Sequence, residues 1–232
     1  DTSMALAMAD ALIESQKTNG YPFDGHMIMN NFLDWRYNGK FSPREKCFDV
    51  GLTVNGALWK YKEDKTTPFT GCTHYKSAGN GGLMRLAPVL IVAKNKSEAI
   101  YLARESTRLT HGAEEALMYS EIFAEEVWDG RILPQYVDYR HPLDIDRDDV
   151  SSGGYVKETF QAAWWAYQTT DSFENCIIEA INLGDDADTV GAVAGMIAGR
   201  MYGFDAIPKW MVEGVQWSEH LIDVSKKLVL LN

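Results

Sequence analysis

Hydrophobic residues recur at helical spacing through most of this chain. In the opening segment the apolar side chains face one way, whereas Asp10, Glu14 and Lys17 are polar. The apolar positions of this segment are Met4, Leu6, Met8, Leu12 and Ile13. The same periodicity predicts further helices over residues 97–109, 112–128 and 154–167.

Two short segments have the pattern of a capping box, in which side chains satisfy the free N–H groups at a helix start. Ser42-Pro43-Arg44-Glu45 places a proline at the first helical position and predicts a helix that runs towards Tyr61. Asp171-Ser172-Phe173-Glu174 predicts a second helix, which runs through Ile181.

Alternation of the kind that marks strands is scarce, and the apolar run 89–92 is too short to decide between strand and helix. The acidic stretch 144–149 is interpreted as a surface loop. It imitates a calcium loop at Asp144, Asp146 and Asp148, but Asp149 and Tyr155 occupy the positions that require Gly and Glu. We therefore predict an all-α fold, a compact single-domain helical bundle over residues 1–232.

Composition and charge narrow the function classes. A chain of 232 residues that is 46% hydrophobic can bury a large core without disulfides or a structural metal. The formal charge of −11 argues against a nucleic-acid partner, and the longest apolar window is too short to cross a membrane. Three scattered cysteines indicate free thiols and a cytoplasmic protein.

The strongest chemical signal is Gly-Asp-Asp-Ala-Asp-Thr at residues 184–189, at the start of a predicted glycine-rich helix. In an extended turn Asp186 and Asp188 point to the same side, and the Thr189 hydroxyl can join them. Three hard oxygen donors suit Mg²⁺ or Mn²⁺, and a cation relieves the repulsion between the carboxylates. Helix capping is the alternative, because aspartate is favoured at helix starts. The glycines of the helix, which we expect to pack against neighbouring helices, are Gly191, Gly195, Gly199 and Gly203.

Three weaker signals could form a ligand site. The glycine-rich turn around Asn80, at residues 77–85, can present backbone N–H groups to an anion or a sugar. His111 and Tyr155 each stand beside flexible glycines, where a flat ligand can stack. A tight turn, a helix cap and a core tyrosine are the alternatives for these three features.

Taken together and in this order, these segments resemble the ADP-ribosylglycohydrolase family, and the resemblance covers nearly the whole chain. The matching segments are Asp1-Thr2-Ser3-Met4-Ala5, Gly79-Asn80-Gly81 with Met84-Arg85, Thr110-His111, Gly154-Tyr155-Val156, and Gly184 with Asp186, Asp188 and Thr189. The resemblance implies an all-α bundle that binds two divalent metals, Mg²⁺ or Mn²⁺. It also implies hydrolysis of the bond between ADP-ribose and the side chain of an ADP-ribosylated protein.

The resemblance also implies a role for each matching residue. Asp1, Asp186, Asp188 and Thr189 would be metal ligands, and the three aspartates would act in catalysis. Gly79, Asn80 and Gly81 would contact ADP-ribose, while His111 and Tyr155 would flank the bond that breaks. Ser77 stands where some arginine-directed members carry Asp, so the modified residue could be arginine or another side chain.

The chain opens at Asp1 as an interior segment would, and the family's upstream Glu and Thr-Asp would precede it. We therefore expect this chain alone to bind metal weakly, at one site at most, and to turn over substrate poorly. One alternative is a catalytically impaired ADP-ribose-binding relative of the same fold. Another is a helical interaction protein without a small-molecule site.

Overall fold

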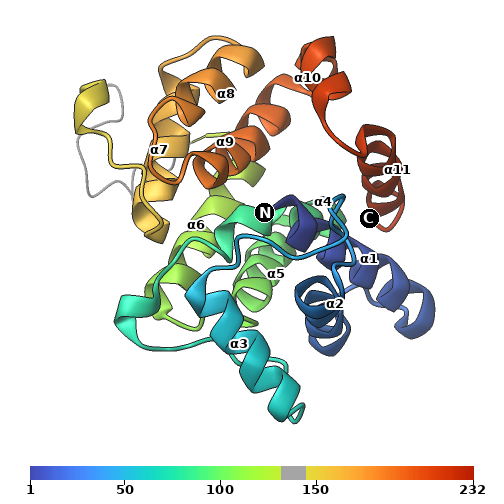
Figure 1. Cartoon of the computed structure of the whole chain (residues 1–232). Coiled ribbons are helices and arrows are strands. Elements are labelled where there is room, and N and C mark those ends of the chain that lie inside the picture. Colours follow the sequence, from blue (N-terminus) through green and yellow to red (C-terminus); the bar gives the residue numbers. More distant parts are fainter. Residues whose placement is uncertain (132–144) are drawn as a thin grey trace.

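The computed structural model describes residues 1–131 and 145–232, and these residues form an all-helical protein (Figure 1). No sheet occurs among them; the backbone makes only two isolated bridges, which pair Cys72 with His111 and Gly79 with Tyr155. The α-helices are α1 (Thr2–Asn19), α2 (Gly25–Asn38), α3 (Leu52–Glu63), α4 (Ala87–Val92), α5 (Lys96–Arg108), α6 (Glu114–Asp129), α7 (Val156–Gln168), α8 (Phe173–Ile181), α9 (Ala187–Tyr202), α10 (Lys209–Gly214) and α11 (Ser218–Val229). Single turns of 3₁₀ helix are η1 (Tyr75–Ser77), η2 (Leu83–Arg85), η5 (Arg147–Asp149) and η6 (Phe204–Ala206).

The helices pack mainly in sequential pairs. α1 lies against α2, α5 against α6, and α8 against α9, while α7 packs on α9. In Figure 1, α7, α8 and α9 form one end of the molecule, and α1 lies beside α2 and α11 at the other. The start of α1 lies near the middle, so the first residues of the chain are close to the junction of the two ends (Figure 1). Among the described helices, none combines the length and the apolar composition that a membrane crossing requires.

A hydrophobic core joins the helices. Its largest fully buried apolar side chains come from α1, α2, α3, α6, α7 and the η2 turn, so distant segments share one interior. Removal of these side chains from water is the main stabilising contribution, at about 25 cal/mol per Å² of apolar surface. The buried side chains are Met4, Met8, Leu12, Ile28, Met29, Phe32, Leu58, Tyr61, Leu83, Phe123 and Trp164.

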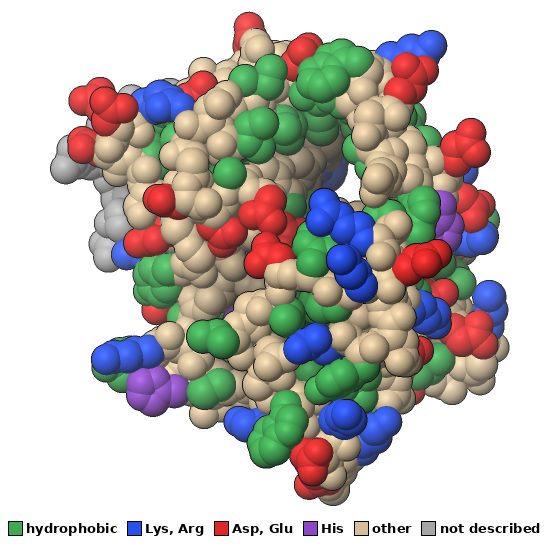
Figure 2. All heavy atoms as spheres, in the orientation of Figure 1, with side chains coloured by type: hydrophobic (Ala, Val, Ile, Leu, Met, Phe, Trp, Pro, Cys, Tyr) green, Lys and Arg blue, Asp and Glu red, His purple; other side chains and the backbone are tan. Residues whose placement is uncertain are grey.

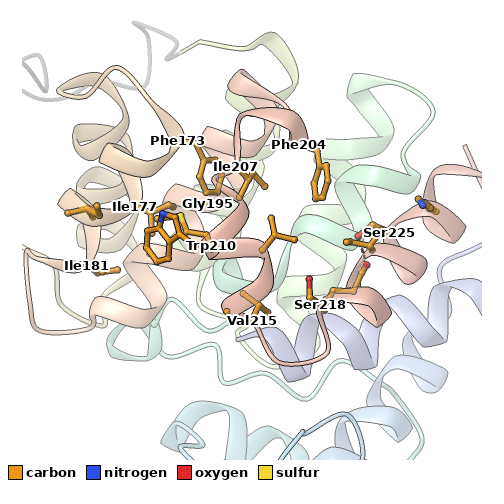
Figure 3. A pocket seen from close by; sticks show the side chains of 18 of the residues that line it. Phe173, Ile177, Ile181, Gly195, Phe204, Ile207, Trp210, Val215, Ser218 and Ser225 are labelled. Atoms are coloured by element: carbon orange, nitrogen blue, oxygen red, sulfur yellow. Dashed lines mark hydrogen bonds between the residues drawn. The ribbon is translucent and has the colours of Figure 1, made fainter.

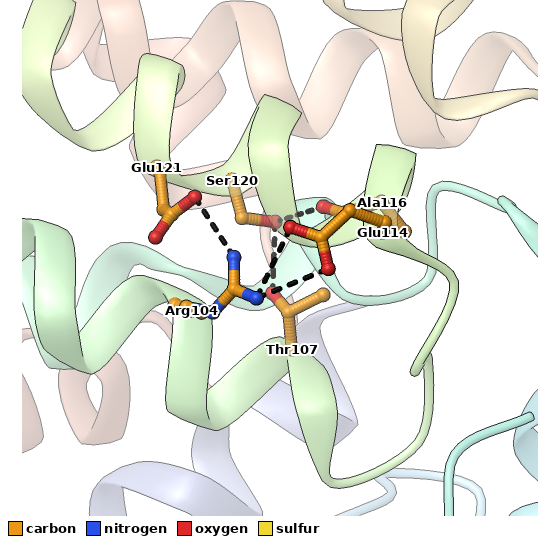
Figure 4. Close-up of polar contacts among 6 residues, drawn as sticks. All are labelled: Arg104, Thr107, Glu114, Ala116, Ser120 and Glu121. Atoms are coloured by element: carbon orange, nitrogen blue, oxygen red, sulfur yellow. Dashed lines mark hydrogen bonds and ion pairs between the residues drawn. The ribbon is translucent and has the colours of Figure 1, made fainter. Parts of the chain in front are cut away.

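Polar contacts hold α5 against α6 on the outside of this core (Figure 4). Arg104 of α5 donates hydrogen bonds to Glu114, with nitrogen–oxygen distances of 3.1 Å, and to Glu121 at 3.0 Å. Deeper in the same interface the Thr107 hydroxyl donates to the Ser120 hydroxyl at 2.8 Å. The ion pairs lie at a partly exposed edge, so each stabilises the pair of helices only modestly.

Most of the predicted helices are confirmed, with small shifts of their ends. α5 begins at Lys96 rather than Ser97, because the side chain of Asn95 accepts the hydrogen bond from the Glu98 N–H and caps the helix. A helix does start at the predicted second capping box, but its cap is Ser172 rather than Asp171: the Ser172 hydroxyl accepts from the Asn175 N–H, and α8 begins at Phe173. The undecided apolar run 89–92 lies in α4.

The prediction for Ser42 is wrong. The Ser42 hydroxyl accepts from the N–H of Arg44 two residues on, not from Glu45, and residues 43–50 are not helical. Glu45 and Asp49 have φ angles of 54° and 50°, in the left-handed region that no α-helix continues through. The helix starts only at Leu52. α2 was missed, although Asp24 caps it by accepting from two backbone N–H groups.

The glycines of α9 were expected to face other helices, and half of them do. A Cβ added to Gly191 would lie 2.9 Å from Ile181 Cγ2, and one added to Gly195 would lie 3.6 Å from Ile177 Cδ1, so α8 approaches α9 at these positions. Nothing lies within 4 Å of a Cβ at Gly199 or Gly203. The expectation was therefore wrong for those two residues. Of the acidic stretch, Asp144 lies outside the described residues, while residues 146–149 are exposed, as a surface loop requires.

Candidate active site

The turn that precedes α9 brings the aspartates of the strongest motif to the start of that helix. Gly184 has a φ of 88° and Asp185 a φ of 47°, so the chain reverses in a left-handed conformation that glycine and aspartate tolerate. Asp186 is the N-cap residue, and its backbone N–H donates to the Ser152 carbonyl at 3.1 Å. The turn is thereby attached to the segment that precedes α7.

Asn80 connects the glycine-rich loop to this turn. Its side-chain nitrogen donates to Asp186 Oδ2 at 2.6 Å and to the Thr159 hydroxyl at 2.8 Å. Asn80 is only 8% exposed, and its hydrogen bond to Thr159 is buried while the one to Asp186 is partly buried, which limits competition from water. One amide therefore fixes the glycine loop, α7 and the start of α9 relative to one another. The Asn80–Asp186 contact spans 106 positions of the sequence.

Backbone pairing places Tyr155 beside the same loop. The Asn80 N–H donates to the Gly154 carbonyl at 3.1 Å, and the Val156 N–H donates to the Ala78 carbonyl at 3.0 Å. A Cβ on Gly154 would lie 3.4 Å from Asp186 Oδ2, so this segment also runs against the aspartate. The structure thus brings together the glycine loop, the segment before α7 and the start of α9.

Tyr155 forms the accessible side of this junction, with 37% of its surface exposed. Burial of part of the ring, together with a hydrogen bond to Glu115 and the charges of Glu115 and Glu158, raises the pKa of Tyr155 to about 12. The phenol therefore stays protonated at physiological pH and can donate a hydrogen bond. Its ring is available to a ligand on the exposed side.

His111 lies on the opposite, buried side of the glycine loop. Its ring is 2% exposed, and a Cβ added to Gly81 would lie 2.7 Å from His111 Cε1. The Thr110 hydroxyl shares a hydrogen bond with His111 Nδ1 at 2.9 Å and accepts one from Arg85 at 2.7 Å. His111 therefore supports the loop from beneath, at both Gly79 and Gly81.

Arg85 is buried completely and completes this support. Its guanidinium donates to the Gly81 carbonyl at 2.7 Å and to the Ser106 carbonyl at 3.1 Å, and it stacks 4.8 Å from the centre of the Phe32 ring. Burial lowers the pKa of Arg85 to about 9, and burial together with the charge of Arg85 lowers the pKa of His111 to about 3. His111 is therefore neutral in the folded protein at physiological pH.

The close approach at Gly81 leads to a prediction. We expect Gly81→Ala to lower the free energy of unfolding by about 1–3 kcal/mol, because its methyl group would overlap the His111 ring and press on Val54. Urea unfolding measures the change. Gly199→Ala is the matched control: its Cβ meets nothing within 4 Å inside a helix, so it should stabilise by about 0.5–1 kcal/mol. A Gly81→Ala protein as stable as the wild type would contradict the tight packing beneath the loop.

The proposed metal ligands gather at one place, but they do not form a closed cage. Asp186 and Asp188 lie close enough to the Asp1 α-amino group that their charges raise its pKa, although burial has the larger effect and lowers it. Figure 2 shows Asp and Glu side chains gathered near the middle of this face, where Figure 1 places the N-terminus. Thr189 is 4% exposed in the first turn of α9.

The donor chemistry of this place fits a divalent cation, since it consists of carboxylate and hydroxyl oxygens at a helix start. Nevertheless, among the residues that the structure describes, no three His, Cys, Asp or Glu side chains converge on one point. Asp1, Asp186 and Asp188 would therefore supply only a partial set of ligands. One of these oxygens, Asp186 Oδ2, is already engaged by Asn80.

A large apolar cavity lies elsewhere. It has a volume of about 1160 Å³, separates α8 and α9 from α10 and α11, and is lined by apolar side chains such as Phe173, Ile177 and Trp210 (Figure 3). Such a lining offers almost no donors to a pyrophosphate, so this cavity does not fit a nucleotide ligand. A second cavity of about 710 Å³ starts at Asp1 and runs between α4, α6 and α9.

Sequence reasoning missed three contributors to the site. Thr159, which fixes Asn80, lies one turn into α7 and reads in the sequence as an ordinary helical position. Glu115 reaches Tyr155 from the start of α6, and Arg85 supports the loop from within the core. Arg85 belongs to a recognisable motif, but only its complete burial distinguishes it from a surface arginine.

A helical fold that joins a glycine-rich loop to an aspartate-bearing helix start is the architecture expected of ADP-ribosylglycohydrolases. The chain belongs to this family, whose model, described as ADP-ribosylglycohydrolase, matches residues 1–232. Its curated relatives include two proteins described as ADP-ribosylarginine hydrolase Tri1. The one from Pseudomonas putida (strain GB-1) is 31% identical over 98% of this chain, and the one from Serratia proteamaculans (strain 568) is 30% identical over 98%.

The chain spans 65% and 66% of the lengths of these two relatives. The ADP-ribosyl-[dinitrogen reductase] glycohydrolase of Rhodospirillum rubrum is 29% identical over 91% of this chain and 71% of its own length. A solved structure described as an ADP-ribosylglycohydrolase-related protein complex matches 99% of this chain and 80% of its own, with a TM-score of 0.78 and 30% identity. The predicted family and fold class are thereby confirmed.

Proposed function

We propose that this chain hydrolyses the glycosidic bond between ADP-ribose and an arginine side chain of a modified protein. The observation that carries the proposal is the Asn80–Asp186 hydrogen bond, which joins the two most specific motifs in a member of this family. Arginine is proposed as the modified residue because the two Tri1 relatives are described as ADP-ribosylarginine hydrolases. Another modified side chain is the alternative, because Ser77 stands where some arginine-directed members carry Asp.

ADP-ribose binds, in this proposal, on the accessible side of the junction. The half-buried Gly79 and the exposed ring of Tyr155 contact the ligand directly. Asn80, Gly81 and His111 are buried, so they act by holding the loop and Asp186 in position. The proposed contact of His111 with the reacting end of the ligand is therefore indirect.

Water attacks the anomeric carbon of the ribose as the bond to the arginine nitrogen breaks, and the leaving nitrogen takes up a proton. The sugar develops positive charge in the transition state, which the carboxylates of Asp1, Asp186 and Asp188 stabilise. One of these carboxylates accepts the proton that the water loses, and this proton passes to the leaving nitrogen. Asp1, Asp186, Asp188 and Thr189 would hold divalent cations, Mg²⁺ or Mn²⁺, two of them when the ligand set is complete. Bound cations would orient the ribose and lower the pKa of the water.

The proposed setting is the cytoplasm, which the three unpaired cysteines support. The partner is an ADP-ribosylated protein rather than a nucleic acid, because a net charge of −11 repels a phosphate backbone.

The test is release of ADP-ribose from an arginine-ADP-ribosylated protein in the presence of Mn²⁺ or Mg²⁺, combined with calorimetric binding of ADP-ribose. We expect slow release by the wild type, because its metal-ligand set is partial, and we expect Tyr155→Ala to weaken ADP-ribose binding by about 1–3 kcal/mol, through lost stacking. Tyr155→Phe keeps the ring and should retain most of the affinity. Tyr101→Ala, at an exposed tyrosine of α5, is the matched control.

The outcomes separate the parts of the proposal. Equal ADP-ribose affinity of the wild type and Tyr155→Ala would remove Tyr155 from the site. Binding of ADP-ribose without release from any modified protein would instead identify a catalytically impaired binding relative.

A further inference from the structure

Positive charge is concentrated in one segment of this acidic protein. Residues 36–62 contain six Lys or Arg against two Asp or Glu, whereas the whole chain has 22 against 33. Four exposed apolar side chains lie in the same stretch: Tyr37 and Phe48 are each 45% exposed, Trp59 is 58% exposed and Leu52 is 91% exposed. Figure 2 shows Lys and Arg side chains interspersed with hydrophobic ones over α2 and α3, and further Lys and Arg side chains beside the acidic group near the N-terminus.

These side chains form one connected surface, because contacts link α2, the loop 41–50 and α3. Arg36 of α2 donates to the Asn55 side chain of α3 at 2.8 Å, and it also hydrogen-bonds the thiol of Cys47 in the loop. The centre of the Tyr37 ring lies 4.2 Å from Lys62 Nζ and 5.4 Å from Arg36 Cζ. We define the basic–aromatic patch as Arg36, Tyr37, Lys40, Arg44, Phe48, Trp59 and Lys62.

Cations are held over rings throughout the patch. Lys40 lies 4.6 Å from the centre of the Phe41 ring, and Arg44 lies 4.2 Å from that of Phe48. A ring beneath a long cationic side chain restricts its motion, so less entropy is lost when a partner binds. Arginine and aromatic residues are also the types that contribute most to binding energy at protein interfaces.

The patch adjoins the candidate active site. Asp49, at the end of the same loop, lies within electrostatic range of the Asp1 α-amino group. On α3, Val54 faces the glycine loop, since a Cβ on Gly81 would lie 3.3 Å from Val54 Cγ2. A macromolecule with one side chain in the site would therefore extend over α2 and α3.

We propose that the basic–aromatic patch docks an acidic segment of the ADP-ribosylated protein whose modified side chain enters the site. This inference rests on the proposed function. Charge complementarity favours a carboxylate-bearing polypeptide of limited size over a nucleic acid, whose long phosphate backbone would also meet the acidic remainder of the surface. The patch would thereby select among modified proteins, while the site recognises the ADP-ribosyl group common to all of them.

Charge reversal in the double variant Arg44→Glu/Lys62→Glu tests the proposal with two substrates. We expect kcat/KM for an acidic ADP-ribosylated protein to fall about tenfold, mainly through KM, with a smaller fall at high ionic strength. For free ADP-ribosylarginine, which is too small to reach the patch, the variant should match the wild type. The matched control is Lys17→Glu/Lys209→Glu, which changes the net charge equally at two exposed lysines outside the patch.

A direct binding arm keeps this test separate from the test of activity. A fluorescent poly-glutamate peptide should bind the wild type and the control variant, and it should bind the Arg44→Glu/Lys62→Glu variant about tenfold more weakly. If the wild type releases no ADP-ribose but shows this binding pattern, the proposed function fails and the docking surface stands. Four outcomes would each overturn the proposal. Three concern activity: an equal loss of kcat/KM on both substrates, an unchanged kcat/KM for the modified protein, or the same loss in the control variant. The fourth is tighter binding of an RNA oligonucleotide than of the peptide.

Discussion

Acidification from pH 6.5 towards pH 3 is expected to cost this protein up to roughly 5 kcal/mol of stability through His111 alone. The pKa of His111 falls from 6.5 to about 3 on folding, because burial and the Arg85 charge disfavour the protonated ring. Between these two pH values the unfolded chain binds a proton that the folded protein does not. Stability is therefore complete above pH 6.5 and is lost as the pH falls through this window.

Urea unfolding of the wild type and His111→Gln at several pH values measures this effect. The Gln side chain cannot titrate, so the variant should show a shallower dependence of the unfolding free energy on pH between 6.5 and 4, whatever its stability at neutral pH. His220→Gln, at an exposed histidine, should leave the slope unchanged. A His111→Gln protein with the wild-type slope would show that the ring is not held neutral.

Replacement of Asp188 is expected to remove most of the divalent-cation affinity that the chain has. Asp188 stands in the first turn of α9, and its charge and that of Asp186 both act on the Asp1 α-amino group, so these carboxylates lie close together. We expect Asp188→Asn to lower Mn²⁺ or Mg²⁺ affinity by at least about 100-fold, since even residues that only support metal ligands account for 10- to 100-fold.

Isothermal calorimetry with circular dichroism distinguishes a ligand from a helix cap. Asp185→Asn is the matched control, because it removes the same charge three residues away and Asn also tolerates the positive φ at this position. A capping role predicts normal metal binding and a loss of about 0.3–1 kcal/mol of stability in Asp188→Asn. That result, or a wild-type chain that binds neither metal, would contradict the proposed ligand set.

The sequence determined the helical class, the approximate positions of most helices and the family. Helical periodicity is a local property of consecutive residues, so it can be recognised without knowing which segments pack together. The motif at 184–189 was interpretable for the same reason: its aspartates, its turn and the start of α9 are contiguous. α2 could have been found in this way too, since Asp24 precedes apolar positions at Ile28, Phe32 and Trp35.

A capping pattern predicted a helix correctly only where the residues after it adopt a helical backbone. Ser172 does cap α8, whereas Ser42 forms a tight turn with Arg44 in a loop that has several left-handed residues. A capping box therefore predicts a helix only if the following residues gain enough from packing, and residues 43–50 bury little.

Only the tertiary structure decided which side of the glycine loop each residue occupies. Asn80 meets Asp186 and Thr159, Tyr155 stays accessible, and His111 is enclosed beneath Gly81 by Thr110 and Arg85. In the sequence, His111 and Tyr155 looked equivalent, as rings beside glycines. Their roles differ because burial and a neighbouring charge come from segments far along the chain, and these determine protonation and access to a ligand. The connected basic–aromatic patch has the same origin, since its cations lie on two helices and a loop that only packing brings side by side.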